Sequence, residues 1–172
     1  MIVTVTKKIM AAAALCVMSA VSFAETKVAV LNPSGAVMAT SAAKAKFEKL
    51  EKSADYAATK AKLDGIVADV KNLQAAYQKD GMTWAAEKKE ENEKKLQNLN
   101  QDYQFNAKKL QTAQQELAQQ IMQEMGAKAE AAIKQVIEAE KIGLLLNSQA
   151  AIHAASEYDI TPKVTDLINK AK

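Results

Sequence analysis

The stretch from residue 41 to residue 140 constrains this chain more than any other part of it. It has one interruption, at Asp80-Gly81, and apolar residues recur every three or four positions on both sides. That spacing places apolar residues on one face of an α-helix. The stretch therefore predicts an antiparallel αα-hairpin of two long amphipathic helices, with Ser41 as the N-cap of the first.

Both helices carry an apolar seam, a stripe of residues that faces the other helix. The outgoing seam shifts its register near Tyr56, as at a stutter in a coiled coil. A polar residue, Asn106, interrupts the returning seam, and such a residue fixes register at some cost in stability. The main seam residues are Leu63, Ile66, Val70, Leu73 and Tyr77 going out, and Leu99, Tyr103, Leu110, Leu117, Ile121 and Val136 coming back.

The turn of the hairpin has its own signals. Gly81 can adopt the left-handed conformation that ends many helices. Thr83 is then the expected N-cap of the returning helix, with Trp84 in its first turn. Residues 87–95 mix Glu and Lys without an apolar stripe. We therefore expect flexibility to concentrate near residues 78–95, where there is little to pack on.

Short apolar segments flank the hairpin and predict a small body, residues 25–40 and 141–172. Residues 27–32 and 142–147 read as buried strands. Residues 150–155 read as a further strand, paired antiparallel with 142–147. Thr161-Pro162 begins a last helix as its N-cap and first residue. The returning helix is longer than the outgoing one, so its last turns should enter this body. The predicted fold class is α+β, mostly helical.

Residues 1–24 have the features of a secretory signal peptide. Lys7 and Lys8 precede an apolar run that is too short to span a bilayer, and Ser22-Phe23-Ala24 matches a cleavage site. Leu15 stands directly before Cys16, where a lipoprotein signal has a small residue. Removal of the signal would leave no Cys. The expected location is an oxidising compartment reached by secretion, such as the periplasm.

The residues that carry enzyme chemistry are scarce. The chain has one His and no Arg. Without Arg, bidentate phosphate recognition and strong nucleic-acid binding are not expected. One Cys and one His cannot form a metal cluster, and no glycine-rich phosphate loop or nucleophile elbow is present. His153 is expected to be a satisfied core residue. We therefore expect no enzyme activity and no cofactor.

A few large apolar side chains lie off the seams: Met82, Trp84, Phe105, Met122 and Met125. They have two interpretations. They can be ordinary helix packing, or they can form an adaptable apolar surface on the inner side of the arms. Met side chains suit surfaces that contact many different partners.

With these features in place, the chain resembles the Skp (OmpH-like) family of periplasmic chaperones. The resemblance rests on the signal peptide, the strand Lys27-Val28-Ala29-Val30-Leu31-Asn32 and the charged hairpin. It continues with Ile142-Gly143-Leu144-Leu145-Leu146-Asn147 and ends with Tyr158-Asp159-Ile160-Thr161 before the last helix.

This resemblance implies a homotrimer in which strands of three subunits close into a barrel. The residues expected in this trimerisation body are Val28, Val30, Ile142, Leu144, Leu146 and Ile152. Three helical hairpins would surround a cavity that holds unfolded outer-membrane β-barrel proteins without ATP. Weak contact with a membrane surface would be a further partner interaction. Some members of the family have a lipopolysaccharide site built on Lys and Arg; this chain has no Arg, so lipopolysaccharide binding is not expected.

Two other interpretations remain from the residues themselves. The amphipathic helices could bind a membrane or lipopolysaccharide surface, although their seams are narrow and their other faces mix Lys with Glu, unlike interfacial helices. The chain could also be a structural coiled coil of the envelope, in which case off-seam aromatic residues would serve no purpose.

Overall fold

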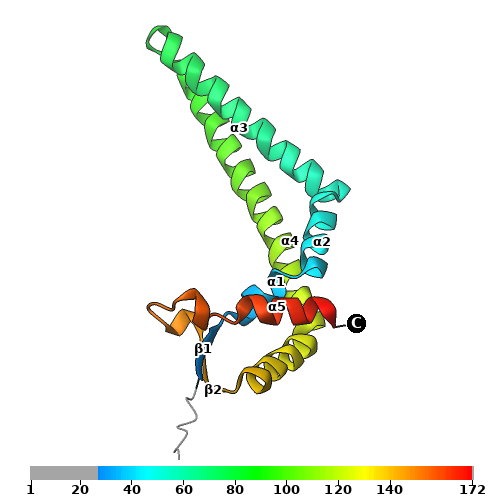
Figure 1. Cartoon of the computed structure of the whole chain (residues 1–172). Helices are drawn as coiled ribbons and strands as arrows, with labels where there is room; N and C mark the ends of the chain where they lie inside the picture. Colours follow the sequence, from blue (N-terminus) through cyan, green and yellow to red (C-terminus); the bar gives the residue numbers. More distant parts are fainter. Residues whose placement is uncertain (1–26, 172) are drawn as a thin grey trace, which may run out of the picture.

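The computed structural model describes residues 27–171, which form a small body and a long helical arm (Figure 1). The arm comprises α2 (Ser41–Glu51), α3 (Ala54–Asp80), the short 3-10 helix η1 (Gly81–Thr83) and most of α4 (Ala86–Glu140). The predicted signal peptide, with Cys16, lies outside the described residues.

The body is built on a two-stranded sheet. β1 (Lys27–Leu31) pairs parallel with β2 (Ile142–Asn147), with Val28 opposite Leu144 and Val30 opposite Leu146. Both strands were predicted. A parallel pair needs a long crossover connection, and here the whole arm forms it. On the other edge of β1, the Ile160 amide donates to the Val30 carbonyl oxygen over 3.0 Å.

The strand predicted at residues 150–155 is wrong. The chain instead forms the 3-10 helices η2 (Ser148–Ala150) and η3 (Ser156–Tyr158), with irregular backbone between them. Four of the six residues are Ala, which has low strand propensity and little side chain to pack. His153 is therefore exposed rather than a core residue, which corrects its predicted environment.

The outgoing helix is two helices rather than one. α2 ends at Glu51, and the Ser53 hydroxyl donates to the Leu50 carbonyl oxygen over 2.6 Å before α3 begins. The break lies three residues before Tyr56, near which the sequence shows its register shift. The N-cap of α2 is Thr40, whose hydroxyl oxygen accepts from the Ala43 amide. Ser41 is the first helical residue, so its predicted cap role is wrong by one position.

The hairpin turns at Gly81, as predicted, but by a different geometry. Gly81 has a right-handed φ of −60°. A Cβ added there would lie 3.0 Å from the Tyr77 ring, so close packing favours glycine here. Thr83 donates to the Asp80 carbonyl oxygen over 2.7 Å, and the residue that precedes α4 is Ala85. Trp84 therefore lies before α4 and not in its first turn.

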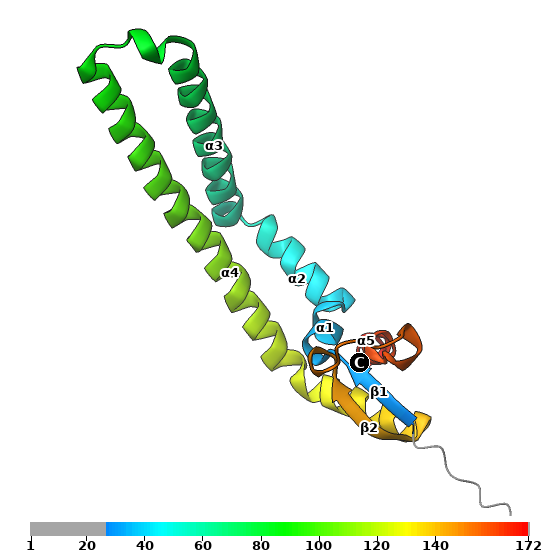
Figure 2. The same cartoon turned by 90° about the vertical axis from the view of Figure 1, so that its left-hand side faces the viewer.

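The last third of α4 belongs to the body, as its length predicted (Figure 2). It packs with α1 (Pro33–Met38), α5 (Thr161–Lys170) and one face of the sheet. α5 begins where Thr161-Pro162 predicts, within one residue. The buried core consists of Ala29, Leu31, Ala36, Val37, Ala43, Ile121, Ala129, Ala132, Val136, Ile142, Ile160, Val164 and Ile168.

Ion pairs at one carboxylate join three parts of the body. Glu140, the last residue of α4, pairs with Lys27 of β1 and Lys163 of α5. The next residue, Lys141, has a φ of 52°, and this left-handed conformation turns the chain from α4 into β2. The hydrogen bonds from Lys163 and Lys27 lower the pKa of the Glu140 carboxyl from its ordinary value of 4.5.

The first prediction concerns the stability of the core. Ile121 of α4 is fully buried there. Replacing Ile121 with Ala removes apolar contacts and leaves a cavity, so the free energy of unfolding should fall by about 2–5 kcal/mol. Met82→Ala is the control, because Met82 is 98% exposed. It should change the unfolding free energy by less than about 0.5 kcal/mol. Urea denaturation at equal protein concentration measures both, and an equal loss in the two variants would contradict this core.

Because of the ion pairs at Glu140, the free energy of unfolding should depend on pH. Because the carboxyl pKa is lower in the folded state, its stabilisation is present above the ordinary value of 4.5 and is lost as pH falls through the folded-state pKa. Between about pH 5 and pH 3 the wild type should therefore lose more unfolding free energy than Glu140→Gln. Glu116→Gln, at an exposed position of α4, should follow the wild type. Parallel curves for wild type and Glu140→Gln would refute a role for these pairs.

Candidate functional site

Large apolar side chains are exposed along the arm. They come from α3, from the turn at the far end of the hairpin, here called the tip, and from the first part of α4. Their exposure is unusual for a helical pair whose apolar seams should face each other. The exposed members are Val67, Tyr77, Met82, Leu96, Tyr103 and Phe105.

The base of the hairpin, nearest the body, is tied by cross-helix contacts. Lys109 pairs with Asp55 over 2.7 Å, and the Gln114 amide donates to the Tyr56 hydroxyl over 2.7 Å. Tyr56 and the predicted polar seam residue Asn106 are buried. Asn106 satisfies its amide on the Asp102 carbonyl oxygen over 2.6 Å, within its own helix. The helices are therefore close and well packed here.

Nearer the tip, α3 and α4 leave an open apolar groove between them. Two adjoining cavities of about 620 Å³ and 470 Å³ share Glu93 and Leu96 in their walls, so they form one continuous groove. Its floor is made by seam residues that the sequence predicted would pack against each other. They are Ile66, Val70, Leu73, Leu99 and Tyr103, and Leu96 lies beside them.

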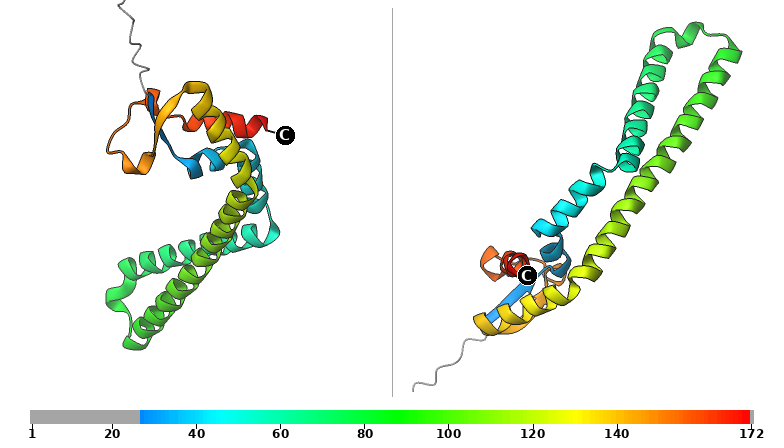
Figure 3. Two further views of the ribbon diagram at one scale, coloured as in Figure 1. Left: turned by 90° about the horizontal axis from the view of Figure 1, so that it is seen from below. Right: turned by 90° about the vertical axis from the view of Figure 1, so that its right-hand side faces the viewer.

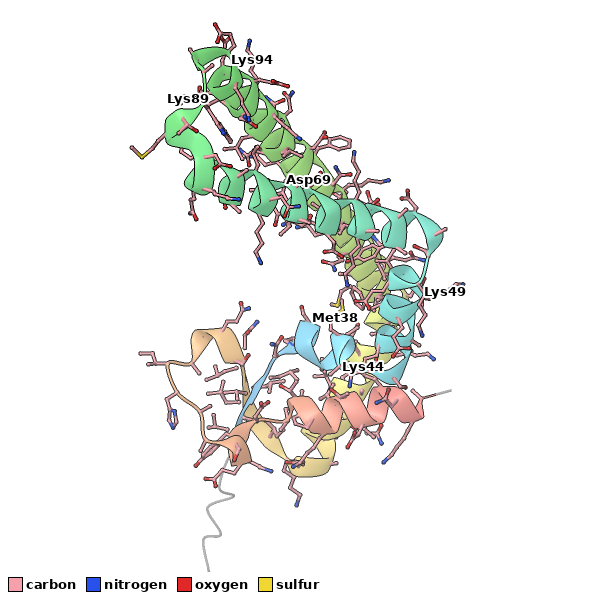
Figure 4. The ribbon with its side chains drawn as sticks, turned by 90° about the horizontal axis from the view of Figure 1, so that it is seen from above. Met38, Lys44, Lys49, Asp69, Lys89 and Lys94 are labelled. Atoms are coloured by element: carbon pink, nitrogen blue, oxygen red, sulfur yellow. The ribbon has the colours of Figure 1, made fainter. Side chains whose placement is uncertain are left out.

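An aromatic cluster closes the tip. The Trp84 and Tyr77 rings meet edge to face, with centroids 5.7 Å apart and planes at 82°. The Lys88 ammonium lies 4.7 Å from the centroid of the Trp84 ring, a cation–π contact. Figure 4 shows the neighbouring Lys89 and Lys94 at the same far end of the arm.

The predicted partner-contact residues fall into two groups. Met82 and Phe105 are exposed on the arm, and Trp84 is half-buried at the tip. Met122 and Met125 are half-buried against the body core, and the Met125 sulfur accepts from the Thr40 hydroxyl at 3.7 Å. The structure thus does not bring the five residues together.

Sequence reasoning missed two exposed residues of the groove. Val67 lies one position after a seam residue and is 53% exposed, while Leu96 closes the charged block and is 39% exposed. A search for apolar residues adjacent to the seam would have found Val67, and continuing the returning seam three residues back from Leu99 would have found Leu96. Both residues are exposed because α3 and α4 leave the groove open between them. The spacing of apolar residues in the sequence does not indicate that opening.

One face of the sheet lacks a helical cover. Residues paired across the strands share a face, which places Val28, Val30, Leu144 and Leu146 together on the side away from the core. Val28, Leu144 and Leu146 are 37%, 49% and 38% exposed, whereas Val30 and Ile142 are buried. Ile152, in the irregular segment after β2, is fully exposed. The views in Figure 3 show this segment projecting beside the sheet.

The outer faces of the arm carry balanced charge. Lys94 pairs with Glu90 over 2.6 Å on the arm, and Lys134 pairs with Glu130 over 2.7 Å in the part of α4 that belongs to the body. The Lys134 hydrogen bond lowers the pKa of the Glu130 carboxyl. Over residues 27–171 no cluster of His, Cys, Asp and Glu could hold a metal ion. Within the same range no helix is long and apolar enough to cross a membrane.

Comparison with known proteins identifies the family of this chain. A family model described as outer membrane protein (OmpH-like) matches residues 27–168. This chain belongs to the OmpH-like (Skp) family. A Skp-like protein of Pseudomonas aeruginosa is 26% identical over 151 residues, which cover 88% of this chain and 89% of that relative. A crystal structure of an OmpH-like protein from Caulobacter crescentus aligns with a TM-score of 0.46 at 22% identity and covers 83% of each chain.

The tip cluster of this OmpH-like chain gives a spectroscopic prediction, because Trp84 is the chain's one tryptophan. Tyr77→Leu removes the ring that shields Trp84, so the tryptophan emission should move to longer wavelength. Tyr103→Leu changes an aromatic residue in the groove and should leave the emission unchanged. Equal spectra in wild type and Tyr77→Leu would show that the two rings do not meet in solution.

Proposed function

We propose that the protein is an ATP-independent periplasmic holdase chaperone that binds unfolded outer-membrane β-barrel proteins and prevents their aggregation. The observation that carries the proposal is the set of large apolar side chains exposed along the arm. Apolar surface of this kind is a liability unless it binds something. Membership of the OmpH-like family supports the same role.

Binding would rest on many weak contacts rather than on one tight site. The exposed apolar residues are spread from Val67 to Phe105 through the tip, and each can shelter part of an unfolded client. Binding the unfolded state by mass action needs no nucleotide. Charged pairs such as Lys94–Glu90 keep the other faces of the helices solvated.

The proposed assembly is a homotrimer whose sheets close into a shared barrel. Two features of the body support it. Val28, Leu144 and Leu146 present an uncovered apolar face, and the outer edge of β2 has no partner strand within residues 27–171. Pairing with strands of other copies would cover the face and remove the edge. The exposed Ile152 would gain shelter in the same step.

The concave side of the protomer is where a cavity would form. Figure 4 shows the arm curving away from the body, with Met38, at the end of α1, near the inner corner where the two meet. Lys44 and Lys49 lie along α2 in the same view. Three such arms around one axis would surround a client, with the tips as its distal boundary.

The test is a dilution experiment. A denatured outer-membrane β-barrel protein is diluted into buffer with and without the mature chain, and aggregation is followed by light scattering. The proposal expects an equimolar trimer to suppress aggregation without ATP. Unchanged scattering would refute it. Anionic vesicles form a separate arm of the experiment, and binding to vesicles with no effect on scattering would favour the membrane-surface alternative.

The assembly gives its own prediction. Leu144→Lys combined with Leu146→Lys places two charges on the uncovered sheet face, and burying such charges is costly. Sedimentation should therefore show a trimer for the wild type and a monomer for this variant. Phe105→Lys, on the arm and 69% exposed, should sediment as the wild type does. A stable wild-type monomer would contradict the shared barrel.

A further inference from the structure

The groove between α3 and α4 differs from an ordinary gap in a helical pair. Its floor is apolar, but amide side chains border it, namely Gln74, Gln78, Asn92, Gln97 and Asn100. An amide carries both donors and an acceptor. The charged residues of its walls are Glu93 and Lys89, one of each sign. The groove is therefore apolar beneath, rich in hydrogen-bonding groups at its border, and balanced in charge.

These properties select the form of the occupant. A helix has already satisfied its backbone amides and carbonyls, so an amide border offers it little. An extended segment carries unpaired backbone groups along its whole length, and those groups need partners. Its side chains alternate between two sides, so every second one can reach the apolar floor. The balanced charge of Glu93 and Lys89 disfavours a strongly charged segment.

The length of the groove agrees with one short segment. From Ile66 to Gln78 it follows α3 for thirteen residues, which is about 18 Å of helix. An extended chain rises about 3.3 Å per residue, so about five residues fit. A membrane-spanning β-strand has about ten residues, with apolar and polar residues in alternation.

We propose that this groove binds one extended segment of an unfolded β-barrel protein, with alternate apolar side chains on its floor and its backbone against the amide border. This inference rests on the proposed chaperone function and names the form of client that a single arm recognises. It assigns binding to the space between the two helices of one arm. The cavity between different arms is a separate place.

Two exposed residues provide the test. Val67 and Leu96 line the groove and are 53% and 39% exposed, so Gln at both positions should leave the hairpin folded. The probes are two labelled peptides of about ten residues. They have the same composition, one with apolar and polar residues in alternation and one with the apolar residues grouped. Ala68→Gln is the matched control, because Ala68 follows Val67 on α3, is exposed and does not line the groove.

Fluorescence anisotropy should show tighter binding of the alternating peptide than of the grouped one. The Val67→Gln, Leu96→Gln variant should weaken that binding by about tenfold or more, the equivalent of about 1.4 kcal/mol. Ala68→Gln should stay within about twofold of the wild type. Equal binding of the two peptides, or a double variant that binds as the wild type does, would overturn the inference.

Two further measurements keep the outcome clear. Circular dichroism checks that the double variant is helical, and a photo-reactive residue at position 67 should cross-link to membrane-strand segments of a full-length client. If position 67 instead cross-links to a second copy of this chain, the groove is an interface between copies and the inference fails. Wild-type protein that suppresses aggregation while the peptides do not bind would refute only this inference. Wild-type protein that does not suppress aggregation would refute the proposed function.

Discussion

The packing of the last third of α4 against α1, α5 and the sheet is the contact on which the rest of the structure depends. Ile121, Ala129, Ala132 and Val136 of this helix are buried in the one core of the body. Because α4 is a single helix of 55 residues, the same element forms half of the arm. The direction of the arm is therefore set by how α4 is held in the body. The sheet, with two strands, could not support the arm alone.

The arm changes in character along its length. Near the body, Tyr56 and Asn106 are buried and an Asp55–Lys109 ion pair joins the helices. Nearer the tip the seam opens into the apolar groove, and the Trp84–Tyr77 contact closes the end. Local stability follows buried apolar contact, so the opened part is the less stable one. The proposed binding of many different unfolded chains would benefit from that arrangement.

Much of this fold could be predicted from the sequence because the hairpin is encoded locally. Periodicity gave the two long helices, and Asp80-Gly81 marked the turn. The strand misassigned at residues 150–155 shows the limit, since that segment is apolar but four of its six residues are Ala, which has low strand propensity. The helix break at Ser53 left only a register shift as its signal. The groove could not be predicted, because spacing identifies a seam without showing whether it closes, as the exposure of Val67 and Leu96 illustrates.

The central claim is that the arm holds the client and the body holds the assembly together. Hydrogen–deuterium exchange of the assembled protein, with and without a bound unfolded β-barrel protein, tests it most directly. The account predicts that the client slows amide exchange in α3 and the first half of α4, while β1 and β2 are protected in both states. Client-dependent protection confined to β1 and β2, with α3 and α4 unchanged, would contradict it.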